Sequence, residues 1–111
     1  MSVYVYHWVP LKNDNMLLGF SFLKPEDAAL MLEGQHPDFK YKLVAVVEGD
    51  DLEKAFELTN TIYGPWWENE GLEPVVLEYA KGARSTSVGD LMVSGGKNWF
   101  VAPVGFKEVN V

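Results

Sequence analysis

The stretch "DLMVSGGKNWFVA", residues 90 to 102, decides the C-terminal part of the fold. Apolar and aromatic residues stand on both sides of the dipeptide Gly95-Gly96. Adjacent glycines supply the positive φ angles that a tight hairpin turn requires. The sequence therefore predicts two antiparallel strands joined at this turn, with Leu91 opposite Phe100.

The same hairpin, extended outward, brings in the segment "ARSTSVGD", residues 83 to 90. Continuing the register pairs Ser85 with Phe106. A bulge or bend is expected near Gly89, because glycine tolerates unusual dihedrals and the opposite strand carries a proline, which cannot donate to a ladder. The carboxylate of Asp90 can accept hydrogen bonds from the serine hydroxyls or from backbone N–H groups that the bulge leaves unpaired.

Two interpretations of this segment stay open. In the first, its polar side chains only satisfy backbone groups of a bulged hairpin. In the second, they form a polar patch that binds a ligand or partner, as in a small-molecule-binding domain or a minor enzyme. The residues of this polar patch are Arg84, Ser85, Ser87, Asp90 and Phe106. His7 or His36 would have to supply the base of a nucleophilic site, and no G-x-S-x-G elbow is present.

Hydrophobic periodicity predicts the remaining elements. The expected strands and helices, besides the hairpin, are a strand over 2–9, a strand over 15–23 that forms a hairpin with it, a helix over 25–33, a strand over 41–48, a helix from residue 51 and a short strand over 74–79. The first strand carries bulky residues on both faces, which is typical of an interior strand. The order β-β-α-β-α-β-β-β predicts an α+β domain with a mostly antiparallel sheet and two helices on one face, and a ferredoxin-like variant with an added hairpin is one version of this class.

The second helix has the clearest start signal. Asp50 is expected as its N-cap, with Glu53 as the capping-box partner. One apolar stripe is expected to face the sheet. Its members are Leu52, Ala55, Phe56, Thr59, Ile62 and Tyr63.

Size and composition predict a single domain over residues 1–111. The chain has 111 residues, of which 48% are hydrophobic, and this is enough to bury a core. Cysteine is absent, so disulfides, iron–sulfur clusters and thiol chemistry are excluded. Two histidines without organised carboxylates fall short of a metal site, and no cofactor is expected. The N-terminus lacks a basic n-region, and no apolar run has the length of a membrane span, so a cytoplasmic protein is expected.

The negative charge is concentrated in one segment. The formal net charge is −7, and residues 48–78 contain nine acidic residues against Lys54 alone. Such a surface repels phosphates, so direct nucleic-acid binding is not expected. The segment favours either simple solubility or a protein partner with a basic surface.

The loop "GPWWENEG", residues 64 to 71, is the expected centre of partner binding. Adjacent residues seldom both point inward, and an exposed tryptophan beside acidic residues suits a basic partner. The alternative is that both rings cap the core. The predicted partner-binding residues are Trp66, Trp67, Glu68, Glu70, Asp51 and Glu57. An edge strand near either terminus would offer unpaired backbone groups, through which a homodimer could form.

One family resemblance adds a setting. "RSTSVGD" followed by "VGF" resembles the C-terminal S-x-S-x-G-D…GF signature of small proteins encoded by phages, plasmids and other mobile elements, the YodL-like domains among them. "LTNTIYGPWWEN" is similar to an L-T-N…W…N segment of some of these proteins. The resemblance covers roughly residues 56 to 108. It implies no established activity, but it implies a mobile-element setting, in which small acidic proteins often bind host machinery.

Overall fold

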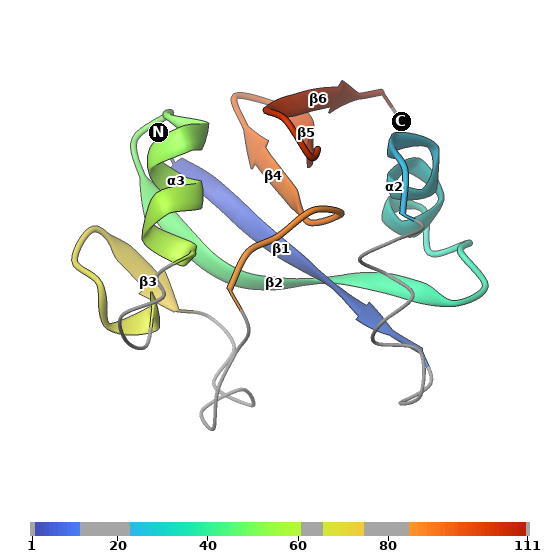
Figure 1. The fold of residues 1–111 in the computed structure, drawn as a ribbon, viewed down its shortest axis with the longest axis horizontal. Coiled ribbons are helices and arrows are strands. Elements are labelled where there is room, and N and C mark those ends of the chain that lie inside the picture. Colours follow the sequence, from blue (N-terminus) through green and yellow to red (C-terminus); the bar gives the residue numbers. More distant parts are fainter. Residues whose placement is uncertain (1, 12–22, 61–65, 75–84, 111) are drawn as a thin grey trace.

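The structure is a computed structural model that describes residues 2–11, 23–60, 66–74 and 85–110. It shows an α+β fold built on an antiparallel sheet, as predicted (Figure 1). The elements in chain order are β1 (Ser2–Pro10), α2 (Pro25–Leu32), β2 (Phe39–Glu48), α3 (Leu52–Thr59), the 3₁₀ helix η1 (Trp66–Glu68), β3 (Leu72–Pro74), β4 (Leu91–Ser94), β5 (Lys97–Val101) and β6 (Phe106–Val109).

Within the described residues the sheet has six strands, in the order β3-β2-β1-β4-β5-β6. Each neighbouring pair is antiparallel. β1 lies inside the sheet between β2 and β4, in agreement with its bulky residues on both faces. The predicted strand over 15–23 falls almost wholly outside the described residues, and so does the predicted strand over 74–79 beyond Pro74.

The two helices cover opposite faces of the sheet, whereas the sequence predicted one face. α3 packs on the core cluster that contains Val3, Val5 and Met92, and α2 packs on the cluster that contains Trp8 and Leu91. Successive side chains of a strand point to opposite faces, so the neighbours Leu91 and Met92 mark the two faces. The physical reason is that the central strands are apolar on both faces, so each face requires a cover.

The ferredoxin-like variant is not observed. A ferredoxin-like plait has the order β-α-β-β-α-β. The described residues instead have the order β-α-β-α-β-β-β-β, in which β1 pairs directly with β2, and β2 pairs directly with β3. Among the described residues no helix is long and apolar enough to cross a bilayer, since α2 and α3 have 8 residues each.

The hairpin at Gly95-Gly96 is confirmed, but the predicted pairing of Ser85 with Phe106 is wrong. Leu91 pairs with Phe100, as predicted. Phe106 does not face Ser85, because the chain reverses after β5. Phe106 begins a separate strand, β6, and pairs with Val101 of β5. A proline and a glycine in residues 102–105 fit this reversal, and the N–H of Ala102 donates to the carbonyl of Gly105 at 3.1 Å.

The bulge expected near Gly89 is present. The N–H of Gly89 donates to the carbonyl of Val101 at 2.9 Å, and the N–H of Val101 donates to the carbonyl of Asp90 at 2.8 Å. Gly89 and Asp90 therefore both lie opposite the single residue Val101, which defines a β-bulge, and Gly89 has a φ of 95°. The N–H of Asp90 also donates to the carbonyl of Ser87 at 3.1 Å, which closes a tight turn just before the bulge.

The second helix begins one residue later than predicted. Its N-cap is Asp51, not Asp50, and the Asp51 carboxylate accepts from the N–H groups of Glu53 and Lys54 at 3.0 and 3.2 Å. Both aspartates are cap-forming types, and only the position where the chain turns decides between them. Ala55 and Thr59 of the predicted stripe are buried, whereas Ile62 and Tyr63 lie outside the described residues.

Candidate functional site

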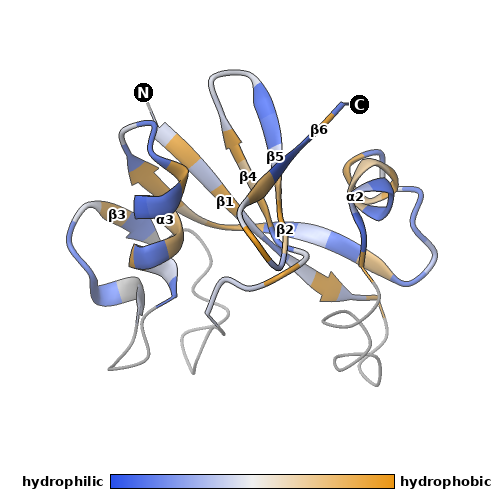
Figure 2. Ribbon diagram, turned by 45° about the horizontal axis from the view of Figure 1, so that its top comes forward, coloured by the Kyte–Doolittle hydropathy of each residue, from blue (hydrophilic) through white to orange (hydrophobic). Residues whose placement is uncertain are grey.

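The acidic segment lies on the surface along its described length. Every described acidic residue between residues 48 and 73 is exposed. These residues, called here the acidic surface, are Glu48, Asp50, Asp51, Glu53, Glu57, Glu68, Glu70 and Glu73. They belong to the end of β2, the start and outer side of α3, the η1 segment and β3. Figures 1 and 2 show α3 and β3 together at one end of the molecule, and α2 at the other end.

The indole of Trp66 belongs to the core and not to this surface. Trp66 is 2% exposed, packs with the cluster beneath α3, and lies edge-on to His7 with ring centroids 5.9 Å apart. The side chain of Trp67 is outside the described part of the structure. Asn69 donates from Nδ2 to the carbonyl of Leu58 at 2.8 Å, which ties the segment to α3. Trp66 therefore anchors the segment from which Glu68 and Glu70 extend.

A second polar feature is buried. His7, Thr59, Thr86 and Asp90 are the buried polar residues that the structure describes, and together they form what we call the polar cluster. They come from β1, α3 and the segment before β4, which are far apart in sequence. The polar cluster therefore joins the central strand, one helix and the RSTSVGD segment.

Hydrogen-bond directions within the polar cluster follow from its hydroxyl groups. Thr59 donates to the carbonyl of Ala55 at 2.8 Å, and Thr86 donates to the hydroxyl of Thr59 at 2.7 Å. Each hydroxyl has one hydrogen, so the Thr86 oxygen is left as an acceptor. His7 Nε2, 2.8 Å from that oxygen, therefore carries a hydrogen and donates. Asn60 adds a bond from Nδ2 to the carbonyl of Thr86 at 2.9 Å.

Asp90 holds two backbone groups in the core. It is 0% exposed, and its Oδ1 accepts from the N–H of Trp8 at 2.9 Å, while its Oδ2 accepts from the N–H of Ser87 at 2.7 Å. His7 Nε2 lies 3.8 Å from Oδ2. The carboxylate thus links β1 to the turn before β4, which is the role that the first interpretation of RSTSVGD expected of it.

The described residues of the predicted polar patch do not share one surface. Asp90 points into the core, Ser85 and Ser87 are half-buried, and Arg84 lies outside the described residues. Phe106 packs edge-on against Phe56 of α3, with ring centroids 6.4 Å apart. The serines and Phe106 are not ladder partners, since β6 pairs with β5.

Thr86 is the residue of this segment that sequence reasoning missed. It stands between the two serines, and an extended chain points alternate side chains in opposite directions. Ser85 and Ser87 are half-buried while Thr86 is fully buried, in keeping with that alternation. The signal was its central place in the motif, but only the contact with Thr59 and His7 shows which side is the inside.

The polar cluster does not have the geometry of a Ser–His–Asp site. In such a site the histidine faces its nucleophile with one ring nitrogen and its carboxylate with the other. Here Nε2 of His7 faces both the Thr86 hydroxyl and the Asp90 carboxylate. The Thr86 hydroxyl also donates its hydrogen to Thr59.

His36 has a structural contact of its own. Its Nδ1 accepts from the N–H groups of Asp38 and Phe39 at 3.0 and 3.1 Å, and its Nε2 lies 3.4 Å from an oxygen of Asp27. Within the described ranges no three histidine or acidic side chains are placed to hold a metal ion.

Comparison with known proteins adds no assignment. No protein-family model, no curated protein and no solved structure matches the chain. The features available for a functional argument are therefore the acidic surface and the shape of the molecule around it.

Proposed function

We propose that the protein is an interaction module that binds a protein partner through the acidic surface. The observation that carries this proposal is the exposure of all eight residues of the acidic surface, of which Asp51 also caps α3. The buried carboxylate of Asp90, in contrast, lies outside the acidic segment, and each of its oxygens accepts a backbone hydrogen bond. The partner that fits is one with a basic surface.

The charge imbalance supports this partner class over a merely solvated face. Lys54 is the one basic residue among residues 48–78, so the nine carboxylates of this segment are not balanced by basic residues of the same segment. Like charges gathered on one end of a small protein repel each other, and a basic partner relieves this repulsion. The same field repels nucleic acid phosphates.

The resemblance to YodL-like proteins supports a phage or mobile-element origin. In a phage or mobile element, a small acidic protein of this kind would act in the cytoplasm by binding a host factor or a defence-system component. The role does not require an enzymatic activity. A further part of the proposal is that homodimerisation is not needed to form the acidic surface, which lies within one chain.

Affinity capture from a host lysate tests this function. Captured proteins should be retained at about 0.1 M salt, where the Debye length is about 10 Å, and lost at about 1 M salt, where it is about 3 Å. A variant with Asp50→Asn, Asp51→Asn, Glu53→Gln and Glu57→Gln should lose them at low salt as well. Asparagine at residue 51 keeps a cap-forming side chain, so α3 is preserved.

A matched control removes four exposed charges elsewhere. It combines Glu26→Gln, Glu33→Gln, Asp38→Asn and Glu108→Gln, all of which change exposed residues outside the acidic segment. The control should keep the captured proteins. Equal capture by the wild type and the acidic-surface variant would refute the proposed function, and equal loss in both variants would show that only net charge matters.

A further inference from the structure

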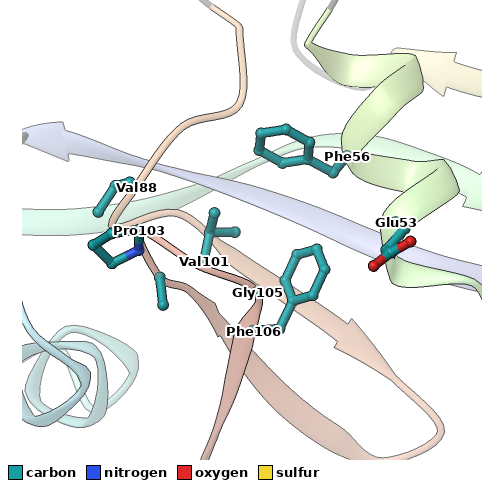
Figure 3. A pocket seen from close by; sticks show the side chains of 8 residues that line it. Glu53, Phe56, Val88, Val101, Pro103, Gly105 and Phe106 are labelled. Atoms are coloured by element: carbon teal, nitrogen blue, oxygen red, sulfur yellow. The ribbon is translucent and has the colours of Figure 1, made fainter.

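A pocket of about 350 Å³ lies between α3 and the reversal that joins β5 to β6 (Figure 3). The side chains that line it are apolar except for the carboxylate of Glu53. The lining residues are Glu53, Phe56, Val88, Val101, Ala102, Pro103, Gly105 and Phe106. In Figure 3 the rings of Phe56 and Phe106 stand on the α3 side, and Val88 and Pro103 lie across from them.

We infer that this pocket receives an apolar side chain of the basic partner, and that a lysine or arginine beside that side chain pairs with Glu53. The inference rests on the proposed function and names the site on which its specificity depends. The pocket volume stands near the lower end of about 300–1,000 Å³ for ligand sites, which suits one side chain.

The surroundings of the pocket favour a polypeptide segment as the occupant. Val104, at the tip of the adjoining reversal, is 91% exposed and extends the apolar surface beyond the pocket. Asp51 and Glu57, both exposed, extend the negative charge along α3 on the other side. A segment that alternates apolar and basic residues matches both sides at once, and a buried anchor within a polar rim is the usual arrangement of an interface hot spot.

Short peptides test this chemistry directly on the intact chain. The probe is Ac-Arg-Phe-Arg-NH2, followed by backbone amide NMR shifts of the isotope-labelled protein. It should shift the amides of Val88, Ala102 and Phe106. Ac-Arg-Ala-Arg-NH2 should bind about ten-fold more weakly, because it lacks the apolar group that the pocket buries. Ac-Glu-Phe-Glu-NH2 should produce no shifts at the pocket.

Charge reversal at the pocket provides the main variant. Glu53→Lys should weaken Ac-Arg-Phe-Arg-NH2 by about five-fold, the upper range of an exposed ion pair, and should permit binding of the acidic peptide. Glu33→Lys is the matched control, because it makes the same charge change at an exposed residue that lies outside the acidic surface and does not line the pocket. It should weaken binding by about two-fold or less.

A second variant fills the pocket. Val88→Phe should abolish the shifts of Ac-Arg-Phe-Arg-NH2, with thermal unfolding used to show that the chain still folds. If this variant does not fold, the charge-reversal pair still tests the inference, because both glutamates are exposed.

Three outcomes would overturn the inference. These are equal binding of the phenylalanine and alanine peptides, equal binding of the basic and acidic peptides, and shifts that map away from the pocket. Lysate capture separates this failure from failure of the function. If the acidic-surface variant loses its captured proteins but the peptides do not enter the pocket, the proposed function holds and the inference fails. If the peptides enter but capture does not depend on the acidic surface, the proposed function fails, and with it the assignment of the occupant.

Discussion

Asp90 is the residue on which the centre of the fold most depends. A buried carboxylate is costly unless its oxygens are bonded, and a buried N–H is costly unless it has an acceptor. Asp90 meets both requirements by accepting from the N–H of Trp8, which lies 82 residues earlier in the chain, and from the N–H of Ser87, which lies 3 residues earlier. Thr86, between the serines, similarly joins His7 to Thr59. The segment before β4 is therefore held in place by two buried side chains, those of Thr86 and Asp90.

Substitution of Asp90 should lower the free energy of unfolding in a graded manner. Asp90→Asn keeps the shape but places an NH2 group against a backbone N–H, so a loss of about 1 to 3 kcal/mol is expected. Asp90→Ala removes the acceptor of the buried N–H of Trp8 and of the partly buried N–H of Ser87, so a loss of about 2 to 5 kcal/mol is expected. Urea denaturation measures both. The control Asp38→Asn changes an exposed acid and should stay within about 0.5 kcal/mol of the wild type. A small effect of Asp90→Ala would contradict the linking role.

At the level of elements, the tight turn and bulge before β4 set the position of the C-terminal hairpin. Gly89 has a φ of 95°, and a Cβ atom built there would lie 3.1 Å from carbons of Leu23 and Trp8. A side chain at Gly89 would therefore require Leu23 and Trp8 to shift by a few tenths of an ångström. The carbonyl of Gly89 also accepts from the hydroxyl of Tyr41 at 2.7 Å. The positive φ and the close packing both favour glycine here.

A pair of glycine substitutions separates these two requirements. Gly96→Ala, at a φ of 76° with nothing near the added Cβ, should cost about 1 to 2 kcal/mol from backbone strain alone. Gly89→Ala should cost about 1 to 3 kcal/mol more, because overpacking is added to the same kind of strain. Thermal or urea unfolding of both variants gives the difference. Equal losses would mean that the core next to Gly89 yields without cost.

At the scale of the whole molecule, the described sheet is covered by a helix on each face and ends in a short strand on each side. The outer strands of the described sheet are β3 and β6, with 3 and 4 residues. Two β6 strands paired about a two-fold axis must place residues of the same face opposite each other. Of the registers that meet this condition, those centred on residue 107 or on residue 108 pair the most residues of β6. The first places Lys107 opposite Lys107 of the second copy, and the second places Glu108 opposite Glu108. Like charges directly opposite are destabilising, so the strand resists self-pairing.

Removal of this charge should promote a homodimer. Lys107→Val leaves the register centred on residue 107 without repulsion and should increase the dimer fraction in sedimentation equilibrium, while the wild type stays monomeric at the same concentration. Lys97→Val, an exposed lysine of β5, which is not an edge strand of the described sheet, serves as the control and should not change association. A wild-type dimer that Lys107→Val does not strengthen would show that β6 is not the limiting edge.

The sequence alone determined the local elements, because their signals are local. Paired glycines predicted the hairpin register, a proline before acidic residues predicted α2, and alternating bulk on two faces predicted an interior first strand. The exposure of the acidic segment was also readable, since carboxylates without partners stay in water. The α+β class followed from the order of these elements.

Only the tertiary structure decided what depends on contacts between distant segments. The turn after β5, not the hairpin register, placed Phe106 next to Val101 and against α3, and so made the pocket. The same holds for Trp66, whose burial depends on His7 and on the cluster beneath α3. Periodicity tells which side chains share a face, but it does not tell which face each helix covers. That choice is made by the total apolar area that both faces of the sheet must bury, which no single segment contains.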